Sequence, residues 1–413
     1  MANKQAAIDV VKRLQREGFQ ALLAGGCVRD MLLGRRPKDY DVATNARPEE
    51  VMALFPRTLE IGAKFGVVIV LARPKPVEVA TFRAETGYQD GRHPETVTFT
   101  NAAEDASRRD FTINGMFYDP LREEVLDFVE GQADLARGLI RTIGAADERF
   151  DEDYLRMLRA VRFATELDFP IEPKTFAAIK KSAPRITAIS GERIATELEM
   201  MLVHPNRGQG AALFFDSGLA SAIFPRLAAT ANPRSAARNP QFGVKVLGRL
   251  RKRVDFALAL AALFADCEPE EALGQCQVLK LSRDLTKHLR FLLTHRRRLL
   301  DDEMSLASLK KLLAQPYFLD LYELERATQK AAQDSDALAA LGRLRRRVRS
   351  LRGVNVQPRR LLNGHDLIRL GAAPGPQVGQ LAEELYIAQL EGHLHTKAQA
   401  RQWATDWLTR HRD

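Results

Sequence analysis

The pattern of apolar and polar residues divides the chain into two parts with different secondary structure. Residues 5–19 show the three-to-four-residue spacing of an amphipathic helix, and residues 47–55 predict a second helix with a proline near its start. Short segments that are valine-rich or alternating predict strands over residues 21–26, 39–44, 58–65, 66–72, 77–82 and 123–129. After about residue 146 the strand signals end and long helical stretches follow. We therefore expect an α+β fold, with a small mixed sheet and its helices in an N-terminal head and only helices beyond it.

Length and composition bound the class of protein. A chain of 413 residues exceeds the size of one ordinary hydrophobic core, so several structural units are expected. Hydrophobic residues make up 45% and charged residues 28%, as in folded globular proteins. The sequence has neither an apolar run of bilayer length nor an apolar leader, and its three cysteines lack paired spacing. We expect a cytoplasmic protein without a membrane partner, in which the cysteines are packing residues.

The net charge of +9 is concentrated in the C-terminal half. Arginine-rich segments begin at residues 245, 294 and 342, and read KVLGRLRKRV, THRRRLL and GRLRRRVRSLRG. Such a concentration is expected of a surface that follows a phosphate backbone. Helix surfaces that happen to be rich in arginine are the alternative interpretation.

The first motif with chemical content runs from Gly25 to Asp41 and reads GGCVRDMLLGRRPKDYD. Asp39 and Asp41 alternate along a predicted strand, which places both carboxylates on one face. Two such carboxylates are suited to hold two Mg²⁺ ions, one activating an attacking hydroxyl and one steadying a leaving pyrophosphate. Gly25 and Gly26 allow backbone N–H groups to approach a triphosphate, and Arg29 can add charge-assisted hydrogen bonds. An Asp-x-Asp without the glycines would be read as a solvated strand end.

This segment resembles the first motif of the polymerase-β-like nucleotidyltransferases, in the bacterial class II branch that holds CCA-adding enzymes and poly(A) polymerases. The resemblance implies a fold with a catalytic head and helical neck, body and tail. It also makes Glu78, in VEVATFR, a candidate third catalytic carboxylate beside Asp39 and Asp41. A charged residue on the exposed face of an edge strand is the alternative for Glu78.

The second motif, SRRDFTINGM over residues 107–116, resembles the family segment that binds the sugar and phosphates of the incoming nucleotide. The resemblance assigns Arg108 and Arg109 to phosphate and Asp110 to the ribose hydroxyls, and Asn114 belongs to the same nucleotide-binding set. The alternative is an ordinary amphipathic helix with a charged start.

The third motif, EDYLRMLRAVRF over residues 152–163, predicts a helix in which Glu152 and Asp153 share a face with Arg156. The usual interpretation is an intrahelical salt bridge, which does not exclude a second role because Asp153 can hold Arg156 in position between turnovers. The segment also resembles the EDxxR motif by which class II enzymes read the base. A carboxylate beside a guanidinium matches the donor–acceptor edge of cytosine or adenine and leaves uracil or guanine with unpaired polar groups. The nucleotide-binding candidates here are Glu152, Asp153, Arg156, Arg159 and Arg162.

Three other segments complete the interpretation. Residues 81–99 are polar and glycine-rich, predict a mobile loop, and resemble the flexible loop of enzymes that use ATP. Residues 190–202 resemble a segment that stabilises the base-reading helix, and residues 362–379 resemble the tail of bacterial members or form a docking loop. The histidines have no spaced carboxylate companions, so we expect them on the surface and predict no phosphohydrolase domain.

These patterns lead to one functional hypothesis. We expect a head over residues 1–145, a neck with the base-reading motif over 146–205, and an RNA-binding body and tail over 206–345 and 346–413. The expected activity is template-independent addition of C and A to the 3′ end of tRNA from CTP and ATP with Mg²⁺, and we infer no obligatory protein partner. The alternatives are a poly(A) polymerase, an enzyme that adds only the A or only the two Cs, and a non-catalytic RNA-binding protein.

Overall fold

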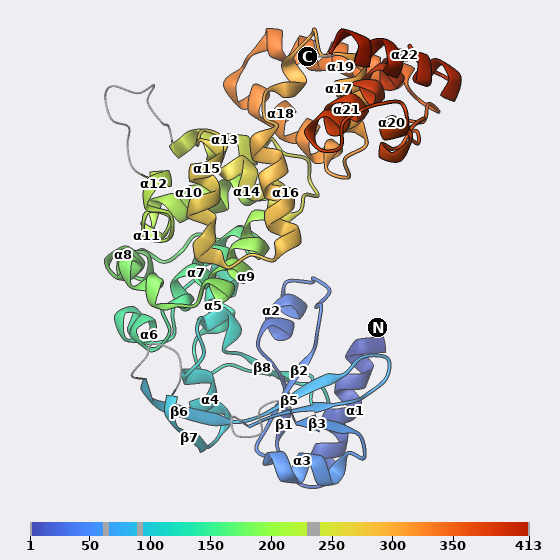
Figure 1. The fold of residues 1–413 in the computed structure, drawn as a ribbon. Helices are drawn as coiled ribbons and strands as arrows, with labels where there is room; N and C mark the ends of the chain where they lie inside the picture. The colour runs from blue at the N-terminus through green and yellow to red at the C-terminus, as the bar shows by residue number, and fades with distance from the viewer. Residues whose placement is uncertain (1, 61–65, 89–93, 229–239, 412–413) are drawn as a thin grey trace. The chain divides into compact units, whose positions relative to one another are not determined.

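The computed structural model describes residues 2–60, 66–88, 94–228 and 240–411, and these form two compact units (Figure 1). The first unit comprises Met1–Val244 and Gly274–Leu281, and the second comprises Lys245–Leu273 and Ser282–Asp413. The finer division into head, neck, body and tail stays a prediction.

The head is built on a seven-stranded sheet in the first unit, with strand order β3-β4-β5-β2-β1-β8-β9. Only β2 and β5 pair in parallel, and the other neighbours are antiparallel, so the sheet is mixed as predicted. The strands are β1 (Ala21–Ala24), β2 (Asp41–Thr44), β3 (Thr58–Glu60), β4 (Val67–Val70), β5 (Val77–Thr81), β8 (Phe117–Asp119) and β9 (Glu124–Leu126).

Hydrophobic burial explains why these short segments form the sheet. All four residues of β1 are buried, and so are the last three of β2, which leaves Asp41 as the exposed first residue of that strand. Helices α1 (Ala2–Arg16) and α3 (Pro48–Leu54) pack against the sheet and against each other. A core cluster joins strand, loop and helix residues: Leu22, Ala24, Ala43, Phe82, Ala102, Ala106 and Phe117.

Several predicted elements differ from the observed ones. The segment predicted as a loop contains a two-stranded antiparallel sheet of β6 (Arg83–Tyr88) and β7 (Pro94–Phe99). Residues in both strands alternate in the strand pattern, and each strand pairs with the other. Residues 89–93 lie outside the described part. The strand predicted over 39–44 begins at Asp41, so Asp39 precedes it. The strand predicted over 58–65 is present as β3, and its remainder lies outside the described residues. Strand β8 was not predicted from the sequence.

The rest of the first unit is helical, as predicted from the loss of strand signals. Helices α7, α9 and α10 pack on one another and support the residues that face the head. The helices are α2 (Gly26–Leu32), α4 (Ala102–Ser107), α5 (Gly131–Arg137), α6 (Ala146–Glu152), α7 (Leu155–Leu167), α8 (Pro173–Ser182), α9 (Gly191–Leu202), α10 (Arg207–Asp216), α11 (Leu219–Ile223) and α12 (Pro225–Ala228).

Helices also make up the second unit. Within the described residues they are α13 (Pro240–Arg249, whose first residues belong to the first unit), α14 (Phe256–Leu263), α15 (Pro269–Cys276, shared between the units), α16 (Arg283–Thr294), α17 (Leu306–Leu313), α18 (Phe318–Ala332), α19 (Ser335–Ser350), α20 (Gly364–Arg369), α21 (Pro376–Glu391) and α22 (Lys397–Arg410). All eight residues of α14 are buried, and a separate apolar cluster that includes Leu381, Leu385 and Trp407 joins α20, α21 and α22. None of the helices found in the described part is both long and apolar enough to span a bilayer.

Two sequence-based expectations about single side chains have different outcomes. Cys27, Cys267 and Cys276 are buried, as expected of packing residues. The expectation that the histidines lie on the surface without carboxylate companions is wrong for His288, which is buried between Asp255 and Asp320 and stacked on Tyr317. These residues come from different elements that only packing brings together.

Candidate active site

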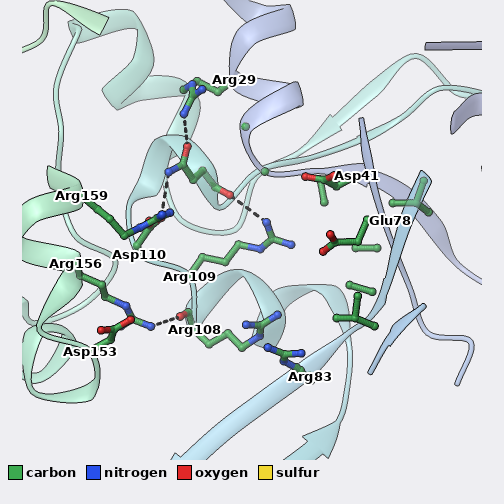
Figure 2. A pocket seen from close by; sticks show the side chains of 18 of the residues that line it. Arg29, Asp41, Glu78, Arg83, Arg108, Arg109, Asp110, Asp153, Arg156 and Arg159 are labelled. Atoms are coloured by element: carbon green, nitrogen blue, oxygen red, sulfur yellow. Dashed lines mark hydrogen bonds and ion pairs between the residues drawn. The ribbon is translucent and has the colours of Figure 1, made fainter. Parts of the chain in front are cut away.

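One cavity of about 490 Å³ in the first unit gathers most of the residues singled out by the motifs. Figure 2 shows Asp41 and Glu78 on one wall, Asp153 and Arg156 on the other, and arginine side chains between them. Of the candidates, the cavity is lined by Gly25, Gly26, Arg29, Asp41, Glu78, Arg108, Arg109, Asp110, Asn114, Asp153, Arg156 and Arg159. Asp39, Glu152 and Arg162 do not line it.

Asp41 and Glu78 are brought together by the parallel pairing of β2 and β5. Val42 lies opposite Val79, so the preceding residues, Asp41 and Glu78, start from neighbouring positions. Although Asp41 is exposed at the cavity, the surrounding protein partly desolvates its carboxyl group, and this desolvation, then Glu78, then Asp39 raise the pKa of Asp41 to about 6, against a weaker opposite effect of Arg109. Crowded carboxylates of this kind fit a divalent cation, because the cation relieves their mutual repulsion.

Asp39 occupies a different position from the one that alternation predicted. It precedes β2, its side chain is 73% exposed, and its Oδ1 lies 3.5 Å from the Nζ of Lys75. It is nevertheless near enough to Asp41 to contribute to the raised pKa of that carboxyl group.

The double glycine forms the turn from β1 into α2. Gly25 has φ 72° and ψ −133°, a conformation that residues with a Cβ rarely adopt, and a Cβ there would lie 2.9 Å from Nη1 of Arg109. The N–H of Gly25 donates to the carbonyl of Met116 at 3.2 Å, so this group is engaged by the protein rather than turned to a ligand. Gly26 begins α2, whose first N–H groups have no intrahelical acceptor.

A buried carboxylate that the sequence interpretation missed holds both arginines of the second motif. Asp105 on α4 is 1% exposed and accepts hydrogen bonds from Arg108 through Oδ1 at 2.6 Å and from Arg109 through Oδ2 at 2.9 Å. Burial acts to raise the pKa of Asp105, but Arg109 and Arg108 outweigh it and lower that pKa. Asp105 also accepts from the N–H of Arg83, the first residue of β6, which itself lines the cavity. The three- and four-residue spacing from Asp105 to the two arginines was the available signal.

Asp110 is a second buried carboxylate, and it faces the cavity. Its Oδ2 accepts from Nη2 and Nε of Arg159 at 2.6 and 2.9 Å, and its Oδ1 accepts from Asn114 at 3.0 Å. Burial acts to raise the pKa of Asp110, but Arg159 and the hydrogen bond from Asn114 lower it to about 2. Asn114 in turn accepts from Arg29 at 2.7 Å, which links α2 to the second motif.

The base-reading motif is not one continuous helix, so the predicted pairing of Asp153 with Arg156 is wrong. Helix α6 ends at Glu152 and α7 begins at Leu155, while Asp153 is extended and its Oδ1 accepts from the N–H of Leu155 at 3.0 Å. Oδ2 of Asp153 accepts from Arg193 of α9 at 2.8 Å.

Arg156 instead pairs with Glu152, as the four-residue spacing predicted, and with backbone carbonyl groups. Its Nη1 donates to Glu152 at 2.5 Å, and its Nη2 donates to the backbone carbonyl of Arg108 at 3.1 Å. The two candidate base readers therefore have separate supports, although both line the same cavity.

Phe163 is a further cavity residue that sequence reasoning missed. Its ring lies 5.2 Å from the guanidinium carbon of Arg29, 5.3 Å from that of Arg159 and 3.9 Å from that of Arg162. Its apolar position in α7 reads as an ordinary core residue, and the fold adds Arg29 to the two arginines of its own helix.

The sheet, its parallel carboxylate pair and the arginine-lined cavity define a nucleotidyltransferase head followed by helices. Residues 21–141 match the model of the poly(A) polymerase head domain, and residues 168–230 match that of the probable RNA- and SrmB-binding site of polymerase A. The CCA-adding enzyme of Geobacillus kaustophilus is 46% identical over 226 residues, which cover 54% of this chain and 55% of that protein. The chain belongs to the family of class II tRNA nucleotidyltransferases and poly(A) polymerases.

Solved structures extend the likeness over nearly the whole chain. The structure of the Bacillus stearothermophilus CCA-adding enzyme in complex with CTP matches with a TM-score of 0.79 and 30% identity, covering 99% of this chain and 98% of that one. The Thermotoga maritima CCA-adding enzyme complexed with tRNA has a TM-score of 0.65 at 20% identity, which is evidence for the fold alone. The sequence match to the curated relative spans about half the length of that protein.

Proposed function

We propose that this protein adds C and A nucleotides to the 3′ end of tRNA, using CTP and ATP and releasing pyrophosphate. The observation that carries the proposal is the shared cavity, in which a carboxylate pair, phosphate-binding arginines and a carboxylate–guanidinium pair face the same space. Membership of the family and the likeness to a CCA-adding enzyme in complex with CTP support the choice of reaction.

The reaction is a displacement at the α-phosphate by the terminal 3′-hydroxyl of the RNA. A new P–O bond forms to the RNA, the bond between the α-phosphorus and the bridging oxygen breaks, pyrophosphate carries away the bonding electron pair, and the proton of the hydroxyl passes to solvent. Asp41, Glu78 and Asp39 are the residues that would hold Mg²⁺, which would supply positive charge for activation of the hydroxyl and for the leaving pyrophosphate.

The arginines of the cavity provide the remaining positive charge for the triphosphate. Asp105 holds Arg108 and Arg109 by ion pairs, so these side chains are oriented before the nucleotide arrives. Arg29, on α2, donates to Asn114, and its guanidinium group lies close to Gly26 at the start of the same helix. Asp110 is the proposed acceptor for the ribose hydroxyls.

Base choice is proposed for Asp153 and Arg156. Asp153 offers an acceptor and Arg156 offers donors, which matches the amino donor and ring-nitrogen acceptor of cytosine and adenine. Uracil and guanine would leave buried polar groups unpaired, and this cost excludes them without a nucleic-acid template.

RNA binding is proposed for the helical regions, with head, neck, body and tail divided at residues 145, 205 and 345. Helix α19 supports this assignment, because Arg345, Arg346 and Arg349 are exposed along it. The proposed substrates, tRNA with CTP and ATP, also support the cytoplasm as the site of action.

The deciding experiment supplies the purified protein with MgCl₂, each nucleoside triphosphate alone, and then CTP together with ATP. The RNA substrates are tRNAs that end before the CCA sequence, after one C, and after both Cs, and the products are sequenced. Completion to CCA followed by a stop is the expected result.

Other products would identify the alternatives. Extension only of tRNA ending in CC indicates an A-adding enzyme, and a stop at CC indicates a CC-adding enzyme. A long A tail on any RNA indicates a poly(A) polymerase, whereas RNA binding without extension overturns the catalytic assignment.

A further inference from the structure

All four acceptor positions of the Asp110 carboxylate are occupied by protein donors. Oδ1 accepts from the backbone N–H of Phe111 at 2.8 Å and from Asn114 at 3.0 Å, while Oδ2 accepts from two nitrogens of Arg159. A carboxylate offers about four lone-pair positions. A ribose hydroxyl can therefore bind Asp110 only if one of these donors leaves.

The surroundings of the three donors identify which one leaves. The N–H of Phe111 is part of the adjacent backbone, and Asn114 is fixed by the hydrogen bond from Arg29. The side chain of Arg159 is 32% exposed to the cavity and already reaches a second carboxylate, because its Nη1 lies 3.3 Å from Oε1 of Glu197. Figure 2 shows Arg159 and Asp110 together at the cavity wall.

Glu197 is placed to receive this guanidinium. It lies on the inner face of α9, is 4% exposed, and its second oxygen accepts from Nε of Arg162. Arg162 also pairs with Glu166 at 2.9 Å. Each carboxylate oxygen of Glu197 therefore faces a different arginine. Glu197 can accept a closer hydrogen bond from Arg159 through one oxygen and keep Arg162 on the other.

We propose that Glu197 is a positioning residue for ribose selection: it takes the guanidinium of Arg159 when the ribose of the incoming nucleotide binds Asp110. The inference rests on the proposed function, and it adds an exchange of Arg159 between two carboxylates to that function. Without the charge of Glu197, Arg159 stays on Asp110 and competes with the ribose hydroxyl. The deoxynucleotide, which lacks the 2′-hydroxyl, is affected less by that competition.

The test compares Glu197→Gln with Glu199→Gln, a matched change on the exposed side of the same helix. For each variant, kcat/KM is measured for CTP and for dCTP with a tRNA that ends before the CCA sequence. Glu197→Gln is expected to lower the CTP-to-dCTP ratio about tenfold, the scale of one hydrogen bond to a charged group. Glu199→Gln is expected to leave the ratio unchanged.

Three further measurements separate charge from folding. Glu197→Asp keeps the charge and is expected to retain most of the ratio, whereas equal losses in Glu197→Asp and Glu197→Gln would overturn the inference. In an Asp110→Asn background, Glu197→Gln is expected to change the ratio no further, because the contested acceptor is weakened; an undiminished effect there would also overturn it. Melting temperatures show whether a variant is folded, and Arg159 and Arg162 each keep one carboxylate in Glu197→Gln.

The activity of the wild-type protein distinguishes failure of the proposed function from failure of the role proposed for Glu197. If it extends no RNA, the proposed function fails. If it extends RNA and Glu197→Gln lowers kcat/KM equally for CTP and dCTP, the proposed function stands and Glu197 is merely structural.

Discussion

Asp41 and Glu78 stand on neighbouring parallel strands, and the pairing of Val42 with Val79 places the two acidic residues at one end of the pair. Partial desolvation, Glu78 and Asp39 raise the pKa of Asp41 to about 6, so its ionised form is less favourable in the metal-free fold than in the unfolded chain. The repulsion between these carboxylates therefore lowers the stability of the metal-free head, and the same carboxylates are the proposed metal ligands.

Asp41→Asn is therefore expected to stabilise the metal-free protein while abolishing catalysis. Removing the unfavourable charge should raise the free energy of unfolding by about 1 kcal/mol, since solvent access to Asp41 screens part of the repulsion. Activity should fall at least about a thousandfold, as expected for loss of a metal ligand. Urea denaturation in EDTA and a tRNA extension assay measure the two effects. A variant less stable than wild type in EDTA would contradict the account of Asp41.

Gly25→Ala is expected to damage nucleotide binding through Arg109. The added Cβ would lie 2.9 Å from Nη1 of Arg109, in addition to the strain of the positive φ, which costs about 1–3 kcal/mol. Gly34→Ala is the control, because Gly34 also has a positive φ but, apart from its chain neighbours, none of the described residues has an atom within 4 Å of the new Cβ. Both variants should lose stability, and only Gly25→Ala should raise KM for CTP. Equal KM values in the two variants would show that crowding of Arg109 is unimportant.

Arg156→Ala is expected to relax the choice of C and A. Its discrimination against UTP and GTP should fall at least about a hundredfold, because the donor side of the base reader is lost. Arg185→Ala, at an exposed arginine paired with Asp151, is the control and should keep the wild-type preference. Incorporation of each nucleotide into tRNA is measured separately. Unchanged preference in Arg156→Ala would remove this residue from the base-reading role.

Asp105→Asn is expected to destabilise the head by about 3 kcal/mol near neutral pH, because two partly buried arginines lose their carboxylate. The pKa of Asp105 is lowered in the fold, so its stabilising effect is present above its ordinary value of 3.8 and is lost as the pH falls toward the lowered value. Urea denaturation at pH 7 and at pH 3 should show the difference from wild type shrinking in acid.

Asp147→Asn is the matched control for Asp105→Asn. Asp147 forms an exposed pair with Lys181, worth less than about 1 kcal/mol. If the free energies of unfolding of Asp105→Asn and wild type differ as much at pH 3 as at pH 7, the charge of Asp105 does not stabilise the head.

His288→Ala is expected to destabilise the second unit. His288 stacks on Tyr317 at 4.1 Å, and its two ring nitrogens lie 3.6 Å from an oxygen of Asp255 and 3.3 Å from an oxygen of Asp320. Loss of these contacts should cost about 2 kcal/mol. His393→Ala, at an exposed position, should stay within about 0.5 kcal/mol of wild type in thermal unfolding. Equal melting temperatures for the two variants would refute the structural role of His288.

The sequence by itself determined the division into a mixed α/β head and a helical remainder, because hydrophobic spacing reports which faces of local elements are buried. It also identified most residues that line the cavity. The glycine turn and the arginines of residues 107–116 are local motifs, and their residue types and spacing indicate binding of a triphosphate. It failed where a local pattern was extended too far: Asp153 was assigned to a continuous helix, although it lies in an extended conformation at the end of α6 and its side chain accepts from the N–H of Leu155.

Only the tertiary structure decided which distant residues support one another. The neighbours Asp41 and Glu78 follow from strand pairing, Arg193 reaches Asp153 from α9, and Glu197 reaches Arg159 by helix packing. His288 was expected at the surface because its two carboxylate neighbours are 33 and 32 residues away along the chain. Spacing along a chain describes one element at a time, whereas burial of apolar faces determines which elements meet and therefore which charges must be paired.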